Sequence, residues 1–268
     1  MAKKLLAVML FVVMAVGAVY AQGTTQPLQL AIFNPVQLVP EDESIAGLSL
    51  GLFYPLNQDV TGLSFTLLGV NGAKGNVQGV SLALGNWAEG YVYGWQAGVV
   101  NHAGSRFVGL QTGIVDIVKG DFTGFQWGLV NWNEGYLHGW QSGVVNYTGG
   151  TQFVGLQDGP VNICKGDFIG LQWGWVNWTE GFVHGVRGGI VNYSKGASVG
   201  LDLGLVNYAE ESYSGVQGGA FNYAGEMHGV QLGILNWTKS LHGLQIGLGN
   251  YNGNKTPLEF MVLVNGSF

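Results

Sequence analysis

The chain has 268 residues, of which 47 are glycine, 47% are apolar and only 10% are charged, and its formal net charge is −6 at pH 7. Average glycine usage near 7% would give about 19 glycines. The glycine excess, with only 6 prolines and 12% aromatic residues, excludes a collagen-like chain and argues against simple disorder, which needs high charge and few aromatics. The composition predicts a repetitive all-β protein.

The N-terminus has the pattern of a secretory signal peptide. Lys3 and Lys4 precede an apolar run over residues 5–19, and Val19-Tyr20-Ala21 offers a cleavage site before Gln22. The alternative, an uncleaved anchor helix, requires a longer apolar run. We expect residues 1–21 to be the signal peptide and residues 22–268 to form a single repetitive β-domain. Without the signal, 8 basic and 16 acidic residues leave a net charge of −8, which argues against nucleic acid as a partner.

A unit of about 15 residues recurs through the rest of the chain. Its core is G-x-Q-x-G-x-V-N or a close variant, with degenerate copies at Gly47, Gly62 and Gly79. The segments between the units are rich in glycine, small polar residues and charges, as is typical of tight turns. Each unit therefore predicts a strand of about ten residues and a turn of about five. The clearer copies begin at Gly94, Gly109, Gly124, Gly139, Gly155, Gly170, Gly185, Gly200, Gly215, Gly229 and Gly243.

Two architectures agree with this repeat. In the first, each unit is one strand of an antiparallel meander that closes into a transmembrane-type β-barrel of about 16 strands, with apolar residues toward lipid and Gly and Gln toward the lumen. In the second, each unit is one coil of a parallel β-solenoid with 15 residues per coil, in which the recurring Asn and Gln stack. In "GLQWGWVNWTEGF" from Gly170, both faces carry apolar groups and the charge lies in the turn. That distribution favours lipid as the solvent, and hence the barrel.

Five charged residues lie inside the apolar segments after residue 21, namely Asp116, Asp158, Arg187, Asp202 and Glu259. Arg187 and Asp202 replace the central Gln in neighbouring units, so we expect them to form a cross-strand ion pair in the lumen of the barrel. The alternatives are two unpaired charges in a water-filled interior and a functional constriction. Asp158, two residues before Pro160, falls in the middle of the expected lipid face, which indicates either a local bulge or a different strand register.

The sequence offers no sign of an enzyme. The glycines form no phosphate-binding motif, and no Ser or Cys lies in a nucleophile motif, so we expect no catalytic residue and no cofactor. The histidines immediately before a repeat glycine would be spread around the rims of a barrel, without a metal site. In a solenoid, His228 and His242 would stack on adjacent coils and could form a surface metal site. These four histidines are His138, His184, His228 and His242, and His102 lies in a turn.

The repeat, the opening "LQLAIFNPVQLVPEDES" from Leu28 and the closing "LVNGSF" resemble those of bacterial surface repeat-containing proteins of unknown function. The resemblance covers nearly all of the chain after residue 21. It implies export and an outer-membrane or cell-surface location, and it supplies no activity and no functional residues. A weaker likeness to curli-type amyloid repeats supports the solenoid.

The function expected from these observations is that of an exported, non-enzymatic outer-membrane or surface protein. It would be structural or pore-like, with the lipid bilayer of the outer membrane as its partner. The alternative is a soluble or surface-attached β-solenoid that acts in adhesion or assembly.

Overall fold

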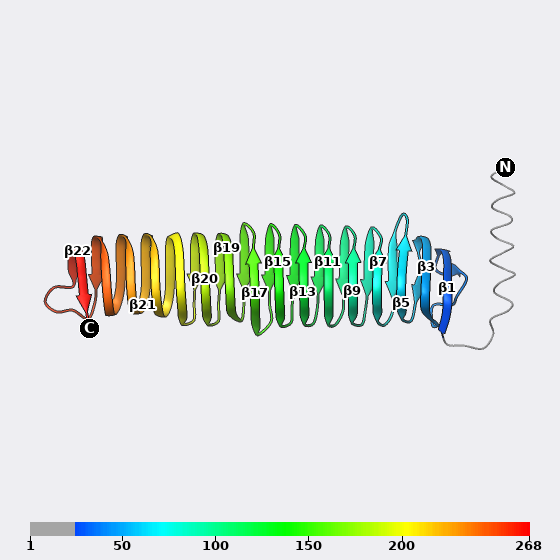
Figure 1. The fold of residues 1–268 in the computed structure, drawn as a ribbon, viewed down its shortest axis with the longest axis horizontal. Coiled ribbons are helices and arrows are strands. Elements are labelled where there is room, and N and C mark those ends of the chain that lie inside the picture. Colours follow the sequence, from blue (N-terminus) through cyan, green and yellow to red (C-terminus); the bar gives the residue numbers. More distant parts are fainter. Residues whose placement is uncertain (1–24) are drawn as a thin grey trace. The chain divides into compact units, whose positions relative to one another are not determined.

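The computed structural model describes residues 25–268, so the predicted signal peptide at residues 1–21 lies outside the described part. The chain divides into two compact units, the first ending at Gly128 and the second running from Leu129 to Phe268. Every regular element of the described residues is a β-strand (Figure 1). Within residues 25–268, no helix combines the length and the apolar character needed to cross a membrane.

The first unit is a stack of two-stranded coils. The first strand of each coil pairs in parallel with the first strand of the next, and the second strands pair likewise, so that Gly94, Gly109 and Gly124 are register partners on β9, β11 and β13. Its strands are β1 (Thr25–Phe33), β2 (Val36–Gln37), β3 (Ser44–Tyr54), β4 (Leu56–Asn57), β5 (Val60–Thr66), β6 (Val70–Ala73), β7 (Val77–Leu82), β8 (Gly85–Ala88), β9 (Val92–Ala97), β10 (Val100–Ala103), β11 (Phe107–Thr112), β12 (Val115–Val118) and β13 (Phe122–Trp127).

The second unit has the same coil, and here the extended backbone increasingly runs through the corners without a break. The 55-residue β21 therefore passes through several successive coils, which contain Gly200, Gly215, Gly229 and Gly243. The strands are β14 (Val130–Asn133), β15 (Leu137–Ser142), β16 (Val145–Thr148), β17 (Gln152–Asp158), β18 (Val161–Cys164), β19 (Asp167–Thr179), β20 (Val183–Ser194), β21 (Ser198–Asn252) and β22 (Phe260–Ser267).

The predicted barrel of about 16 antiparallel strands is therefore wrong. The described residues form a parallel β-solenoid of about 12 coils, which is the alternative architecture. The error came from reading each unit as one strand. Gln172 and Asn177 are both buried, although residues an odd number of positions apart point to opposite faces of a flat strand. The backbone turns a corner between them, near Gly174, so both side chains point inward. In the coil of β15 and β16 the same corner, at residues 143–144, separates two short strands.

Each coil turns four side chains inward, and two of them are usually amides. The Asn side chains form a column in which each Nδ2 donates to the Oδ1 of the next coil, as in Asn177 to Asn192 at 2.8 Å and Asn192 to Asn207 at 2.8 Å. The second N–H of the same amide is also used, since Asn177 Nδ2 donates to the Gly188 carbonyl at 3.0 Å. Buried amides are thus paired both along the stack and with the backbone.

The Gln column runs in the opposite sense. Gln172 Nε2 donates to Gln157 Oε1 of the preceding coil at 2.8 Å, and Gln245 donates back to Gln231 at 2.8 Å. In the first unit Gln126 donates to Gln111 at 2.9 Å. The Asn amides donate toward the next coil, whereas the Gln amides donate toward the preceding coil. The dipoles of the two columns therefore oppose one another.

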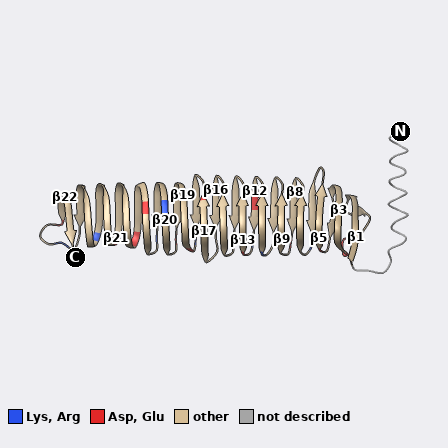
Figure 2. Ribbon diagram, in the orientation of Figure 1, with Lys and Arg blue, Asp and Glu red and all other residues tan. Residues whose placement is uncertain are grey.

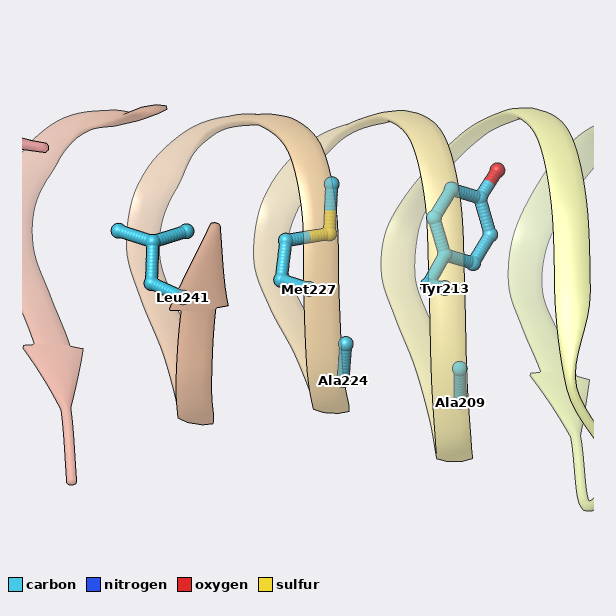
Figure 3. Close-up of a cluster of buried hydrophobic side chains, with 5 residues drawn as sticks. All are labelled: Ala209, Tyr213, Ala224, Met227 and Leu241. Atoms are coloured by element: carbon cyan, nitrogen blue, oxygen red, sulfur yellow. The ribbon is translucent and has the colours of Figure 1, made fainter. Parts of the chain in front are cut away.

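The other two inward positions hold a small residue and an apolar residue. The apolar column contains stacked phenylalanines, with ring centroids 5.3 Å apart for Phe107 and Phe122. Near the C-terminal end it passes through Tyr213, Met227 and Leu241, with the small residues Ala209 and Ala224 beside them (Figure 3). These side chains fill the interior, which leaves no open lumen in the coils shown there.

Antiparallel pairing occurs at the N-terminal end of the first unit and at the C-terminal end of the second. At the N-terminal end of the first unit, β1 pairs with β2 in antiparallel fashion, and Gln29 Nε2 donates to Asn57 Oδ1 at 3.0 Å. At the other end of the second unit, β22 pairs antiparallel with the end of β21, and Asn265 Nδ2 donates to Gln245 Oε1 at 3.1 Å. Capping strands of this kind keep sheet edges from pairing with further chains.

The first position of the repeat must be glycine because the backbones of neighbouring coils approach closely there. Gly215 has φ +135°, and a Cβ there would lie 2.1 Å from the carbonyl oxygen of Gly200 in the preceding coil. Gly218, three residues later, has no such φ, and its Cβ would meet only the flexible end of Leu203 at 3.1 Å. A side chain is therefore excluded at Gly215. The second repeat glycine, Gly219, is equally tight, since a Cβ there would lie 2.2 Å from the carbonyl oxygen of Gly204, whereas Gly218 has room for one.

We expect Gly215→Ala to lower the free energy of unfolding by at least about 3 kcal/mol, because a strained φ and a backbone clash act together. Gly218→Ala, the matched control in the same coil, should change it by less than about 1 kcal/mol. Chemical denaturation followed by circular dichroism measures both. Equal losses in the two variants would contradict the close approach of the coils.

Candidate interaction surface

The two turns of each coil differ sharply in composition. The turns that follow the first strands carry large apolar side chains that are 43% to 64% exposed, and we call this row the apolar edge. It comprises Leu67, Leu68, Leu84, Val99, Ile114 and Trp127 in the first unit and Leu129, Val144, Trp173, Trp175, Ile190, Leu203, Leu205, Leu232, Ile234 and Leu248 in the second.

The turns that follow the second strands form the charged edge. Opposite charges alternate on successive coils from Lys165 through Glu180 and Lys195 to Glu210, and Lys165 forms an ion pair with Glu180. Figure 2 shows strands that are almost free of charged residues. The charged edge comprises Asp59, Lys74, Glu89, Arg106, Lys119 and Asp121 in the first unit and Glu134, Lys165, Asp167, Glu180, Lys195, Glu210, Glu211, Glu226 and Lys239 in the second.

Asp158 is the one charged residue at the apolar edge within residues 25–268. It ends β17, and its carboxylate accepts hydrogen bonds from Trp140 Nε1 and from Ser142 Oγ, the latter at 3.3 Å. It borders a shallow depression beside Trp173 and Trp175. Asp158 therefore does not face lipid from the middle of a barrel strand, as predicted. It lies at a corner of the solenoid, where Trp140 and Ser142 donate hydrogen bonds to its carboxylate.

An aromatic row follows the outer face of the second strands, at the position after most of the repeat Asn residues. Its rings stack on one another, with centroids 3.9 Å apart for Trp132 and Tyr147 and 4.4 Å for Tyr208 and Tyr223. In the first unit Trp87 stacks on His102 at 3.9 Å. Stacking occupies the ring faces, so the row presents mainly ring edges to the outside and is poorly suited to flat stacking of sugar rings.

Arg187 and Asp202 lie side by side in the interior of the second unit. Arg187 Nε donates to Asp202 Oδ1 at 2.8 Å and Nη2 donates to Oδ2 at 2.5 Å, while Nη1 donates to the Tyr193 carbonyl at 2.8 Å. Both side chains are at most 1% exposed. The expected ion pair between Arg187 and Asp202 is present. It replaces two neighbouring positions of the Gln column in the interior of the solenoid, so its expected place in the lumen of a barrel is wrong.

Asp116 replaces an Asn of the amide column in the first unit. Its Oδ1 accepts from Asn101 Nδ2 at 2.7 Å, and its Oδ2 has no hydrogen-bond partner. Burial raises the pKa of Asp116 to about 7, against the opposing effect of hydrogen bonds from Asn101 and Gly113. The signal for this role in the sequence is a carboxylate at the position of the repeat Asn.

The histidines before the repeat glycines lie on the outer face of the first strands. His138 pairs in register with Val154, and His184 lies between Ile169 and Val199. His228 and His242 instead stack on each other, as the solenoid alternative predicts, with ring centroids 4.7 Å apart.

No protein-family model matches the chain, and neither the curated proteins nor the solved structures give a match. The resemblance to bacterial surface repeat proteins therefore stays a prediction.

We expect Asp116→Asn to stabilise the fold above pH 7 and to have little effect at pH 4. The folded carboxyl, with a pKa of about 7, holds a proton that the unfolded chain releases near its ordinary value of 3.8. Between these values the folded state binds more protons, so the contribution of Asp116 to stability falls as pH rises. The asparagine variant should gain about 2–4 kcal/mol over the wild type at pH 8.

Urea denaturation of both proteins at pH 4, 6 and 8 checks this difference. Asp121→Asn, at an exposed position of the charged edge, serves as the control and should show no comparable pH dependence. A stability difference between Asp116→Asn and wild type that is the same at pH 4 and pH 8 would refute the account.

Proposed function

We propose that the protein is an exported, non-enzymatic adhesion protein that attaches to lipid surfaces through the apolar edge. The observation that supports this is the separation of apolar and charged side chains onto the two opposite turns of most coils. The apolar edge would rest in the boundary between headgroups and acyl chains, and the charged edge would face water. The expected signal peptide and the resemblance to surface proteins support export.

The repeat places the apolar side chains of neighbouring coils in one row. Neighbouring parallel strands lie about 4.8 Å apart, and most coils add a large side chain to that row, with a gap at residues 218–220 of the second unit. Soluble monomers rarely expose contiguous apolar patches above a few hundred Å². Leu205 and Leu248 are 60% and 64% exposed, and complete burial of one such side chain contributes about 1.5–3 kcal/mol. A few coils together therefore supply substantial surface affinity.

The charge balance indicates which lipid should bind. The chain carries 16 acidic and 10 basic residues in total, so an anionic membrane would repel it rather than attract it. Attachment should depend on apolar burial and occur on zwitterionic lipid. The pore-like function expected from the sequence assumed a barrel, and a β-solenoid gives it no support.

We expect the full chain, purified and freed of detergent, to float with phosphatidylcholine vesicles in a density gradient. The double variant Leu205→Lys/Leu248→Lys places two ammonium groups in the apolar edge and should lower the floated fraction by at least about fivefold. The matched control Thr151→Lys/Asn254→Lys adds the same charge at turns of the charged edge and should float like the wild type.

Failure of the wild type to float, or equal flotation of both double variants, would overturn this proposal. Sedimentation without lipid tests the alternative that the apolar edge binds a second copy of the chain. If the wild type forms oligomers that Leu205→Lys/Leu248→Lys dissociates, and does not float, the apolar edge joins copies of the chain and the lipid proposal fails.

A further inference from the structure

We propose that Glu226, His228 and His242 form a binding site for a divalent transition-metal ion such as Zn²⁺. One carboxylate oxygen and one ring nitrogen from each histidine all lie within 4.8 Å of one another. Glu226 Oε1 is 3.4 Å from His228 Nε2 and 4.0 Å from His242 Nδ1. The site lies next to the charged edge, and it is independent of the proposed attachment to lipid.

The local strand geometry explains why these three side chains meet. Met227 points into the core and is fully buried, so Glu226 and His228 on either side of it point outward on the same face. The unit that contains His228 has 14 residues, so His242 occupies the same position of the next coil. The two imidazoles stack with ring centroids 4.7 Å apart and an interplanar angle of 4°.

Two imidazole nitrogens and one carboxylate oxygen are ligands that Zn²⁺ prefers, and their spacing is close to that of a zinc site. Zinc binds His nitrogen and carboxylate oxygen at about 2.0–2.2 Å in tetrahedral geometry, which places neighbouring ligand atoms about 3.4 Å apart. The observed 3.4 Å and 4.0 Å separations exceed an ordinary hydrogen bond of about 2.7–3.2 Å. The three donor atoms thus converge without strong hydrogen bonds among themselves. The Glu226–His228 separation already equals the tetrahedral value, and the wider separations, all within 4.8 Å, would shorten on binding.

Binding requires one small rearrangement. The in-plane lone pairs of parallel rings do not meet at one point, so at least one imidazole must turn about its Cβ–Cγ bond, a torsion with a broad energy profile. The side chains of His228, His242 and Glu226 are 45%, 52% and 49% exposed, so they have room to turn. Three protein ligands leave a fourth coordination position toward solvent, where water or a ligand from another molecule can bind.

Isothermal titration of the tag-free full chain with ZnCl₂ tests the site. We expect one Zn²⁺ per chain, and we expect His228→Ala/His242→Ala to weaken this binding at least about tenfold, since each histidine supplies a ligand. Glu226→Gln should weaken it less. Mg²⁺ and Ca²⁺ should not compete, because these ions prefer all-oxygen sites.

The matched control is His138→Ala/His184→Ala. These histidines occupy the same repeat position, but their register partners include Val154, Ile169 and Val199 rather than a second histidine. The control should bind Zn²⁺ like the wild type, and circular dichroism should show that both variants keep the fold. Absence of Zn²⁺ binding by the wild type, or equal weakening by both double variants, would overturn the proposal.

Discussion

The stacked side-chain amides in the interior are the constraint on which the fold depends. Each Asn uses its two N–H groups, one toward the next Asn and one toward a backbone carbonyl, so a displaced coil would leave several buried polar groups unpaired. An unpaired buried polar group costs about 1–3 kcal/mol, so the amide columns hold neighbouring coils in one register. Alignment in turn brings Gly215 against the Gly200 carbonyl and leaves room only for glycine.

The ordered interior also explains the exterior. Since four positions per coil face inward and the coils align, every outward position becomes a row along the unit. A residue preference repeated in successive units therefore becomes a continuous type of surface. Apolar residues follow the first strands, charges follow the second strands, and aromatic rings follow most of the repeat Asn residues. A residue that departs from its row is also aligned with its neighbours on adjacent coils. His228 and His242 depart from the row of residues before the repeat glycine in this way, and they stack on each other.

The sequence predicted the β-class, the repeat unit and the position of the charges in turns, and its solenoid alternative placed His228 beside His242. It led to the wrong main architecture because both faces of the unit contain apolar residues, which are typical of lipid contact as well as of this exposed surface. The spacing of five between Gln172 and Asn177 was the available signal for a corner. The outward direction of each apolar side chain could not be predicted without that corner.

The Arg187–Asp202 pair gives the most direct test of the amide columns, because it interrupts one of them. Removing one partner, as in Arg187→Gln, leaves a buried carboxylate uncompensated and should cost about 3–5 kcal/mol of unfolding free energy. Arg187→Gln/Asp202→Gln would extend the column from Gln172 to Gln217, so its stability should return to within about 1 kcal/mol of the wild type or exceed it. A double variant as unstable as the single one would contradict the central role of the columns.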